Sequence, residues 1–204
     1  SSGSILLDGN DVSTFNIKHL RSNIALVDKT NHFFPGSLRD NFQRILPNAN
    51  NDRISWACET ANATDQMQEL NVSLETQMDD LQGIWNEDFK IKLSLARALI
   101  RNPKVLILDD IFSDMDTDSI LRFKATFDKI SKSRTMVLVS RDLYNLTVCK
   151  KLMFFNGTAL AQYGQTAAIL EQDGPAKDLM KKQLRVISPK FEQDYKTSIK
   201  SVVS

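Results

Sequence analysis

Two short apolar runs limit most strongly how this chain can fold. Residues 105–108 (Val-Leu-Ile-Leu) are followed at once by Asp109 and Asp110, and residues 135–139 form a second run of strand length. An uninterrupted apolar strand is typical of a parallel sheet that is buried on both faces. We therefore expect both runs to be buried strands, with polar residues at their carboxyl ends, the edge where open α/β sheets bind ligands.

Helical spacing of apolar residues separates the expected strands. Residues 86–100 and 116–131 carry apolar side chains at intervals of three and four, and residues 24–27 add another strand-length apolar run. Strands that alternate with helices predict an α/β domain with a mainly parallel sheet. Between residues 151 and 163, two further runs flank Asn156-Gly157, a dipeptide that predicts a hairpin turn.

Residues 45–85 interrupt this alternation with a helical pattern and no comparably strong strand. Asn51 or Asp52 is expected to cap one helix there, and Thr64 a second one. Upstream, Ser37 is expected to cap a short helix over residues 38–43. The stretch therefore indicates a helical insertion between strands of the sheet.

Composition excludes several classes of protein. The 204 residues carry 26 Lys+Arg and 25 Asp+Glu, so the net charge of +1 argues against a dedicated nucleic-acid binder. No apolar run reaches the roughly 18 residues of a membrane helix, and no signal peptide is expected. The two cysteines, Cys58 and Cys149, form no metal-type pair, which favours a reducing, cytosolic setting.

Glycine is scarce. The chain has 7 glycines, where average usage predicts about 14. Neither G-x-x-x-x-G-K-[ST] nor G-x-G-x-x-G occurs, so the residues alone disfavour an enzyme that cradles phosphates with a glycine-rich loop.

A family resemblance is carried by residues 95–104 (Leu-Ala-Arg-Ala-Leu-Ile-Arg-Asn-Pro-Lys), which lead into the run that ends at Asp110. This segment resembles the stretch between the signature helix and the Walker B strand in nucleotide-binding domains of ABC transporters. Residues 2–9 (Ser-Gly-Ser-Ile-Leu-Leu-Asp-Gly) and 33–41 (Phe-Phe-Pro-Gly-Ser-Leu-Arg-Asp-Asn) fit the same family. The layout between residues 47 and 83 resembles exporters of the type I secretion class.

The resemblance implies a P-loop ATPase type of fold with two lobes. Residues 1–44 and 86–187 would form the α/β core, truncated at its N-terminus, and residues 45–85 an inserted helical subdomain. Residues 188–204 would form an amphipathic tail. In the family the phosphate-binding Walker A loop precedes the segment that matches residues 2–9. Either the chain is a fragment of a longer transporter that carries this loop, which we expect, or the parent gene lacks the loop.

The resemblance assigns roles at the strand ends. Asp109 matches the Walker B aspartate that helps hold Mg²⁺, and Asp110 stands in place of the glutamate that polarises the attacking water. Arg141 replaces the H-loop histidine, and Lys29 replaces the Q-loop glutamine. Lys29 and Arg141 equally fit ordinary solvated side chains. Because aspartate is one methylene shorter than glutamate, weak or absent hydrolysis is expected.

Residues 86–88 (Asn86, Glu87, Asp88) occupy the place of the signature motif, whose glycines approach the γ-phosphate of ATP in the partner domain. Each of the two acids there would repel a phosphate charge by about 4 kcal/mol at 4 Å and an effective dielectric constant of about 20, although acids also suit an ordinary helix N-terminus. Asp116 matches the D-loop aspartate. The acidic run of Asp114, Asp116 and Asp118 also weakly resembles a calcium-binding loop, but this run lacks the glycine and the glutamate that such a loop requires.

The resemblance predicts an ATP-binding domain of an ABC exporter, of the toxin and protein type I secretion class. It would couple ATP binding to transport at the cytoplasmic face of the membrane. ATP and Mg²⁺ would bind the parent protein and not this chain alone, which is expected to be soluble and inactive as an ATPase. Its partners would be a transmembrane domain and a second nucleotide-binding domain. The alternatives are a non-catalytic regulatory or scaffold domain, or the degenerate half of an asymmetric heterodimer.

Overall fold

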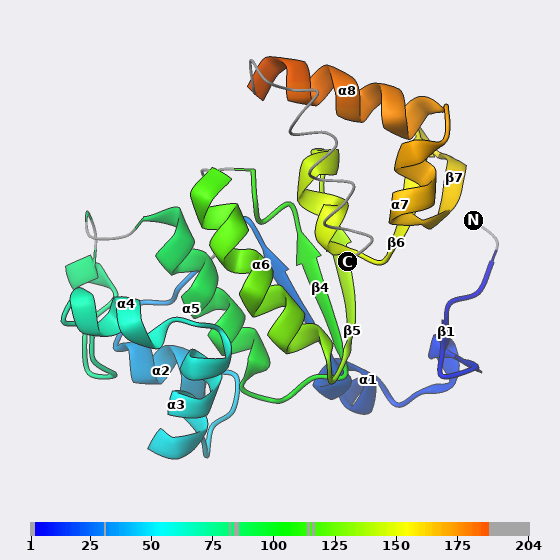
Figure 1. The fold of residues 1–204 in the computed structure, drawn as a ribbon. Helices are drawn as coiled ribbons and strands as arrows, with labels where there is room; N and C mark the ends of the chain where they lie inside the picture. Colours follow the sequence, from blue (N-terminus) through cyan, green and yellow to red (C-terminus); the bar gives the residue numbers. More distant parts are fainter. Residues whose placement is uncertain are drawn as a thin grey trace. The chain divides into compact units, whose positions relative to one another are not determined.

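The computed structural model describes residues 3–30, 32–81, 83, 86–113, 115 and 117–187. The chain divides into two compact units, one of residues 1–109 and 129–137 and the other of residues 110–128 and 138–204. Figure 1 shows the helices and strands of both units. The predicted tail, residues 188–204, lies outside the described residues.

The first unit contains most of the helical elements. In chain order its elements are β1 (Leu6–Leu7), β2 (Asn10–Asp11), η1 (Val12–Thr14), α1 (Ile17–Asn23), β3 (Ile24–Asp28), α2 (Leu38–Gln43), α3 (Asn51–Thr60), α4 (Thr64–Glu69), η2 (Asp79–Leu81), α5 (Glu87–Leu99) and β4 (Val105–Asp109). Helix α6 (Thr117–Ser131) and strand β5 (Thr135–Val139) are each divided between the two units.

The central sheet confirms the predicted α/β class with a parallel sheet. Within the described residues its strand order is β3-β4-β5, and β3 runs parallel to β4 with Ile24 opposite Val105 and Asp28 opposite Asp109. This register brings the carboxyl ends of β3 and β4 together. Two aspartates therefore lie side by side at the edge where ligands of α/β sheets gather.

The prediction that both apolar runs are buried on both faces is wrong. In β4 the buried side chains Leu106 and Leu108 alternate with partly buried ones, and in β5 Val137 and Val139 are exposed. Successive side chains of a strand point to opposite faces, so an uninterrupted apolar run does not reveal whether both faces are covered.

Helix α5 is the centre of the core of the first unit. Its buried residues include Phe89, Ser94 and Leu95, which at 100° per residue lie on different sides of the helix. A helix that is buried almost all round must pack against neighbours on several sides, and it contacts both α3 and β3. The predicted helix over residues 86–100 is confirmed, with Asn86 as its N-cap.

The helical stretch contains the predicted helices, but their caps were assigned one residue late. The N-cap of α3 is Asn50, whose side chain accepts a hydrogen bond from the Arg53 amide, and not Asn51 or Asp52. The N-cap of α4 is Ala63, which has no capping side chain, while Thr64 is the first helical residue. Neighbouring polar residues compete for a cap position, so residue type alone does not fix the register.

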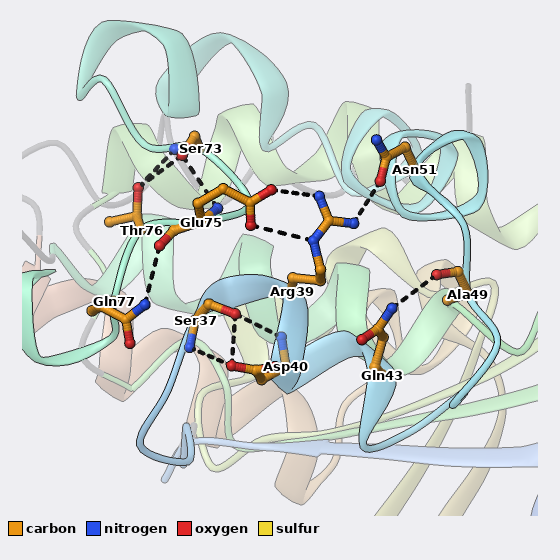
Figure 2. Close-up of polar contacts among 10 residues, drawn as sticks. All are labelled: Ser37, Arg39, Asp40, Gln43, Ala49, Asn51, Ser73, Glu75, Thr76 and Gln77. Atoms are coloured by element: carbon orange, nitrogen blue, oxygen red, sulfur yellow. Dashed lines mark hydrogen bonds and ion pairs between the residues drawn. The ribbon is translucent and has the colours of Figure 1, made fainter.

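Helix α2 has partners for the four amide groups at its start. Ser37 and Asp40 form a capping box, in which each side chain accepts a hydrogen bond from the other's backbone amide. The amides of Leu38 and Arg39 donate to the carbonyls of Thr76 and Leu74, at 2.9 and 2.8 Å. Helix starts normally leave these donors without helical partners, so the segment near residue 75 completes the helix start (Figure 2).

Two further contacts join the start of α2 to distant segments. Arg39 forms a two-pronged ion pair with Glu75, at 2.6 and 3.2 Å, and also contacts Asn51 at the start of α3. Gly36 has φ of +112°, and a Cβ there would lie 2.9 Å from Asp40 Oδ2, so this position requires glycine.

Replacing Ser37 with alanine is expected to lower the free energy of unfolding by about 1 kcal/mol, because the Asp40 amide loses its capping partner. Urea denaturation followed by circular dichroism measures this change. Thr64→Ala is the matched control, since Thr64 does not cap α4, and it should stay within about 0.5 kcal/mol of the native chain. Equal losses in the two variants would contradict the capping role of Ser37.

The second unit contains the confirmed hairpin. Strands β6 (Lys151–Asn156) and β7 (Ala159–Gln165) pair antiparallel around a turn in which Gly157 has φ of +61°. The hairpin is followed by α7 (Thr166–Glu171) and α8 (Pro175–Ile187), and it is preceded by η3 (Leu143–Val148). A core cluster holds these elements together: Leu143, Leu146, Leu152, Ile169, Leu170, Ala176, Met180 and Leu184.

Among the described residues, no helix has the length and apolar character that crossing a membrane requires. The division into a core of residues 1–44 and 86–187 and a helical subdomain of residues 45–85 remains a prediction.

Candidate functional site

The carboxyl ends of β3 and β4 place two acidic residues side by side. Asp109 is exposed and is the register partner of Asp28. Asp28 Oδ1 accepts hydrogen bonds from both the amide and the hydroxyl of Thr30. Asp109 therefore presents an exposed carboxylate, whereas the carboxylate of Asp28 is already held by its own loop.

Asp110 turns the chain sharply after β4. Its φ of +52° lies in the left-handed region, which aspartate tolerates better than most residues. Its amide donates to the Val139 carbonyl at 2.9 Å, and its carbonyl accepts a hydrogen bond from the Ser113 hydroxyl at 3.1 Å. These contacts fix the backbone of Asp110 and hence the direction of its Cα–Cβ bond.

The structure brings Asp110 and Arg141 together. Arg141 Nη2 lies 3.0 Å from Asp110 Oδ2, and the two side chains form an ion pair. The Asp110 side chain is 18% exposed and that of Arg141 is 81% exposed. Because the Arg141 side chain of this pair is largely in solvent, the pair contributes little stability. Its main consequence is that a guanidinium occupies one oxygen of the Asp110 carboxylate.

Asn86 caps helix α5 at the position assigned to the signature motif. Its Oδ1 accepts hydrogen bonds from the Phe89 amide at 2.8 Å and from Gln66 Nε2 at 3.2 Å. Glu87 is the first helical residue, and its carboxylate lies 2.7 Å from Lys90 Nζ. The acid at this position is thus paired within the first turn of its own helix.

Asp88 is buried and forms an ion pair with Lys92 one turn along α5. The Asp88 Oδ2–Lys92 Nζ distance is 2.7 Å, and each side chain is 10% exposed. Lys92 Nζ also donates to Gln66 Oε1 of α4 at 3.1 Å. Asp88 Oδ1 is buried and has no hydrogen-bond partner among the described residues.

The electrostatics of this helix start therefore differ from the sequence expectation. Both Glu87 and Asp88 have a lysine partner, so the two acids do not present two uncompensated negative charges. The sequence signal for this was available, because Lys90 and Lys92 follow the acids at spacings of three and four, where helical side chains meet.

Two candidate residues remain, Lys29 and Asp116. Lys29 is exposed and follows the last residue of β3. Asp116, the candidate D-loop aspartate, lies outside the described residues, as does Asp114 of the calcium-loop alternative. Within the part of the chain that the structure describes, no group of three or more His, Cys, Asp or Glu residues is arranged to hold a metal ion.

The cysteines are unsuited to nucleophilic chemistry. Burial raises the pKa of Cys58 to about 12 and that of Cys149 to about 11. The reactive form of cysteine is the thiolate, which is scarce at neutral pH for both residues. The chemistry available to the site is therefore that of its carboxylates and cations.

Asp109 fits the role of a Mg²⁺ ligand. Protein sites for Mg²⁺ commonly supply one or two carboxylates, while water and substrate phosphates complete the coordination. An exposed carboxylate at the end of β4 meets this requirement, and Asp110 is less available because Arg141 occupies one of its oxygens.

The described fold is shared with an ABC exporter. It matches the structure of a bacterial Atm1-family ABC exporter with ATP bound, with a TM-score of 0.79 and 21% sequence identity, over 89% of this chain and 32% of that one. The family model for ABC transporters matches residues 1–113, more than half of the chain. The chain therefore belongs to the ABC transporter family, as the sequence resemblance indicated.

Curated relatives of this chain come from several different organisms. Multidrug resistance protein 1 of Entamoeba histolytica is 31% identical over 177 residues, which are 85% of this chain and 14% of that protein. P-glycoprotein 14 of Caenorhabditis elegans is 27% identical over 181 residues, 89% of this chain and 14% of that protein. Across the most similar relatives the chain spans between 10% and 31% of their length.

Proposed function

We propose that this chain forms part of the ATP-binding domain of an ABC exporter and that its own strand-end site supports ATP hydrolysis poorly. The observation that carries the second part is the ion pair between Asp110 and Arg141. Family membership supports the first part.

The chemical argument concerns the attacking water. Enzymes that transfer phosphoryl groups to water orient that water with a side chain that accepts its hydrogen bond. Asp110 stands where the family has a glutamate, and one of its two oxygens accepts a hydrogen bond from Arg141. Arg141 is a cation with donors only, so it cannot replace the acceptor nitrogen of a neutral histidine.

The binding argument concerns ATP and Mg²⁺, which ATPases of this family generally use. The metal would be held by Asp109, and Lys29 would contribute a positive charge near the end of β3. No G-x-x-x-x-G-K-[ST] motif occurs in the 204 residues. The phosphate-binding loop would therefore come from sequence outside this chain.

The proposed partners follow from the same family. A second nucleotide-binding domain would face residues 86–88, and a transmembrane domain would receive the motion through the helical stretch of residues 45–85. For the transported substrate we propose, more narrowly, a protein or toxin, as in exporters of the type I secretion class. The names of the relatives instead include multidrug transporters.

The test restores the two family residues in the full-length protein encoded by the gene. Asp110→Glu combined with Arg141→His is expected to raise Mg-ATP turnover by about 10²-fold, because an error of about 1 Å in positioning costs about that factor. Arg122→His is the matched control, since Arg122 pairs with Ser119 and not with Asp110, and its turnover should stay at the native level.

Nucleotide affinity, measured by titration with a fluorescent ATP analogue, separates the alternatives. Micromolar binding with slow turnover supports the proposal. Rapid native turnover that Asp110→Asn abolishes would overturn the claim of poor hydrolysis. Absence of binding by the full-length protein would instead favour a non-catalytic scaffold domain.

A further inference from the structure

The side chain of Gln66 joins helix α4 to two points on helix α5. Its Nε2 donates a hydrogen bond to Asn86 Oδ1 at 3.2 Å, and its Oε1 accepts one from Lys92 Nζ at 3.1 Å. Figure 1 shows α4 beside α5 within the first unit. Both ends of one planar amide are therefore used on a helix that follows later in the chain.

The two partners fix the orientation of this amide. Asn86 Oδ1 also accepts a hydrogen bond from the Phe89 amide at 2.8 Å, so the atom that faces Gln66 is an acceptor. Lys92 Nζ has donors only and must meet an oxygen. The Gln66 amide therefore fits in one orientation, with its nitrogen toward Asn86 and its oxygen toward Lys92. Neither a carboxylate nor an apolar side chain could make both bonds.

Both contact points belong to the start of α5. Asn86 is the N-cap of this helix, and Lys92 pairs with Asp88 at 2.7 Å, where each side chain is 10% exposed. A hydrogen bond that involves a charged group is stronger than one between neutral groups. Gln66 is thus bonded both to the cap and to the buried ion pair of the helix start that occupies the place of the signature motif.

Helix α4 depends on contacts with its neighbours. It has six residues, Thr64–Glu69, and its N-cap Ala63 makes no side-chain capping bond. Isolated helices shorter than about 12 residues are unstable in water, so α4 needs support from the rest of the fold. Its packing on α3 provides part of this support, and the two bonds of Gln66 to α5 provide another part.

We propose that Gln66 couples α4 to the start of α5, so that a nucleotide bound against residues 86–88 also restricts the motion of α4. This inference rests on the proposed function, in which the nucleotide of a second domain lies against these residues. Gln66 is then a positioning residue that acts through Asn86 and Lys92. Because coupling between two sites is reciprocal, a membrane domain that binds and orders α4 would strengthen nucleotide binding at residues 86–88 by the same factor.

Hydrogen exchange followed by mass spectrometry on the full-length protein encoded by the gene tests this coupling. The probe is Mg²⁺ with adenylyl imidodiphosphate, an ATP analogue that is not hydrolysed. The segments compared are residues 87–92 and residues 67–72, whose amides at Met67, Leu70 and Val72 donate to backbone carbonyls. In the native protein the probe should slow exchange at least about threefold in both segments, because couplings between sites are commonly of this size or larger.

Gln66→Met removes both hydrogen bonds while keeping an unbranched side chain. At saturating probe, the slowing in residues 67–72 should fall below about 1.5-fold, whereas residues 87–92 should still be slowed at least about threefold. Gln68→Met is the matched control, because Gln68 is an exposed residue of the same helix. Both segments of this control should respond as in the native protein.

A second variant separates coupling from folding. Gln66→Glu keeps an acceptor for Lys92 and loses the donor to Asn86, so its midpoint of urea unfolding should stay closer to the native value than that of Gln66→Met. Because only one of the two bonds remains, the slowing in residues 67–72 should be at most about half of the native effect.

The outcomes distinguish this inference from the proposed function. Slowing confined to residues 87–92 in the native protein would overturn the coupling alone, as would full slowing in residues 67–72 of a folded Gln66 variant. No slowing of residues 87–92 in the native protein would overturn the proposed contact between residues 86–88 and a nucleotide, and the coupling with it.

Discussion

Replacing Lys92 with methionine is expected to lower the free energy of unfolding by about 3 to 5 kcal/mol, the usual cost of removing one partner of a buried ion pair. Lys92 and Asp88 are each only 10% exposed, and the second oxygen of Asp88 has no hydrogen-bond partner in the part of the chain that the structure describes. Without Lys92 the carboxylate would remain in the core with no compensating charge. Chemical denaturation followed by far-ultraviolet circular dichroism measures the loss.

Two comparisons make this result specific. Asp88→Leu combined with Lys92→Met should recover most of the loss, because replacing both charges by apolar groups is often neutral. Lys90→Met removes a lysine from the more exposed pair with Glu87 and should cost less than about 1 kcal/mol. A double variant as unstable as Lys92→Met would contradict the argument from unpaired charge and would point to lost packing.

Replacing Phe123 with alanine is the second large change, with an expected cost of about 3 to 5 kcal/mol. Phe123 is 1% exposed and meets the ring of Phe112 edge-on, with 5.0 Å between ring centroids. Removal of the ring would leave a cavity next to Phe112, two residues beyond Asp110. Urea denaturation of the two proteins gives the difference in stability.

Phe155→Ala is the control for this experiment. Phe155 belongs to the same unit but is 56% exposed, so its truncation should change the free energy of unfolding by less than about 0.5 kcal/mol. A loss below about 1 kcal/mol for Phe123→Ala would mean that the core around Phe112 closes over the missing ring.

The sequence predicted most of the regular elements, because their signals are local. Helix α5, the cap at Ser37 and the hairpin around Gly157 each depend on residues a few positions apart. The caps of α3 and α4 were missed by one residue, since several neighbouring side chains were suitable. The exposed face of β5 could not be predicted. An apolar run indicates that a strand can be buried, but it does not show which other elements cover each face of that strand.

The candidate site was predictable in part. The positions of Asp110 and Arg141 followed from the family resemblance, but their ion pair joins residues 31 positions apart and required the structure. The lysine partners of Glu87 and Asp88 were predictable from the sequence, because Lys90 and Lys92 follow at helical spacings of three and four. The comparison with the signature motif considered only the two acids.

The pairing of the α2 start with residues 74–78 has a consequence for how this family can vary. Gly36 accepts from the Met78 amide and Ser37 bridges to Gln77, so the helices between them form a loop whose two ends are tied together. Doubling the length of a flexible closed loop costs only about 0.6 kcal/mol of entropy. Because these contacts hold the two ends of the loop together, the intervening segment can gain or lose residues while the strands on either side, β3 and β4, keep their register.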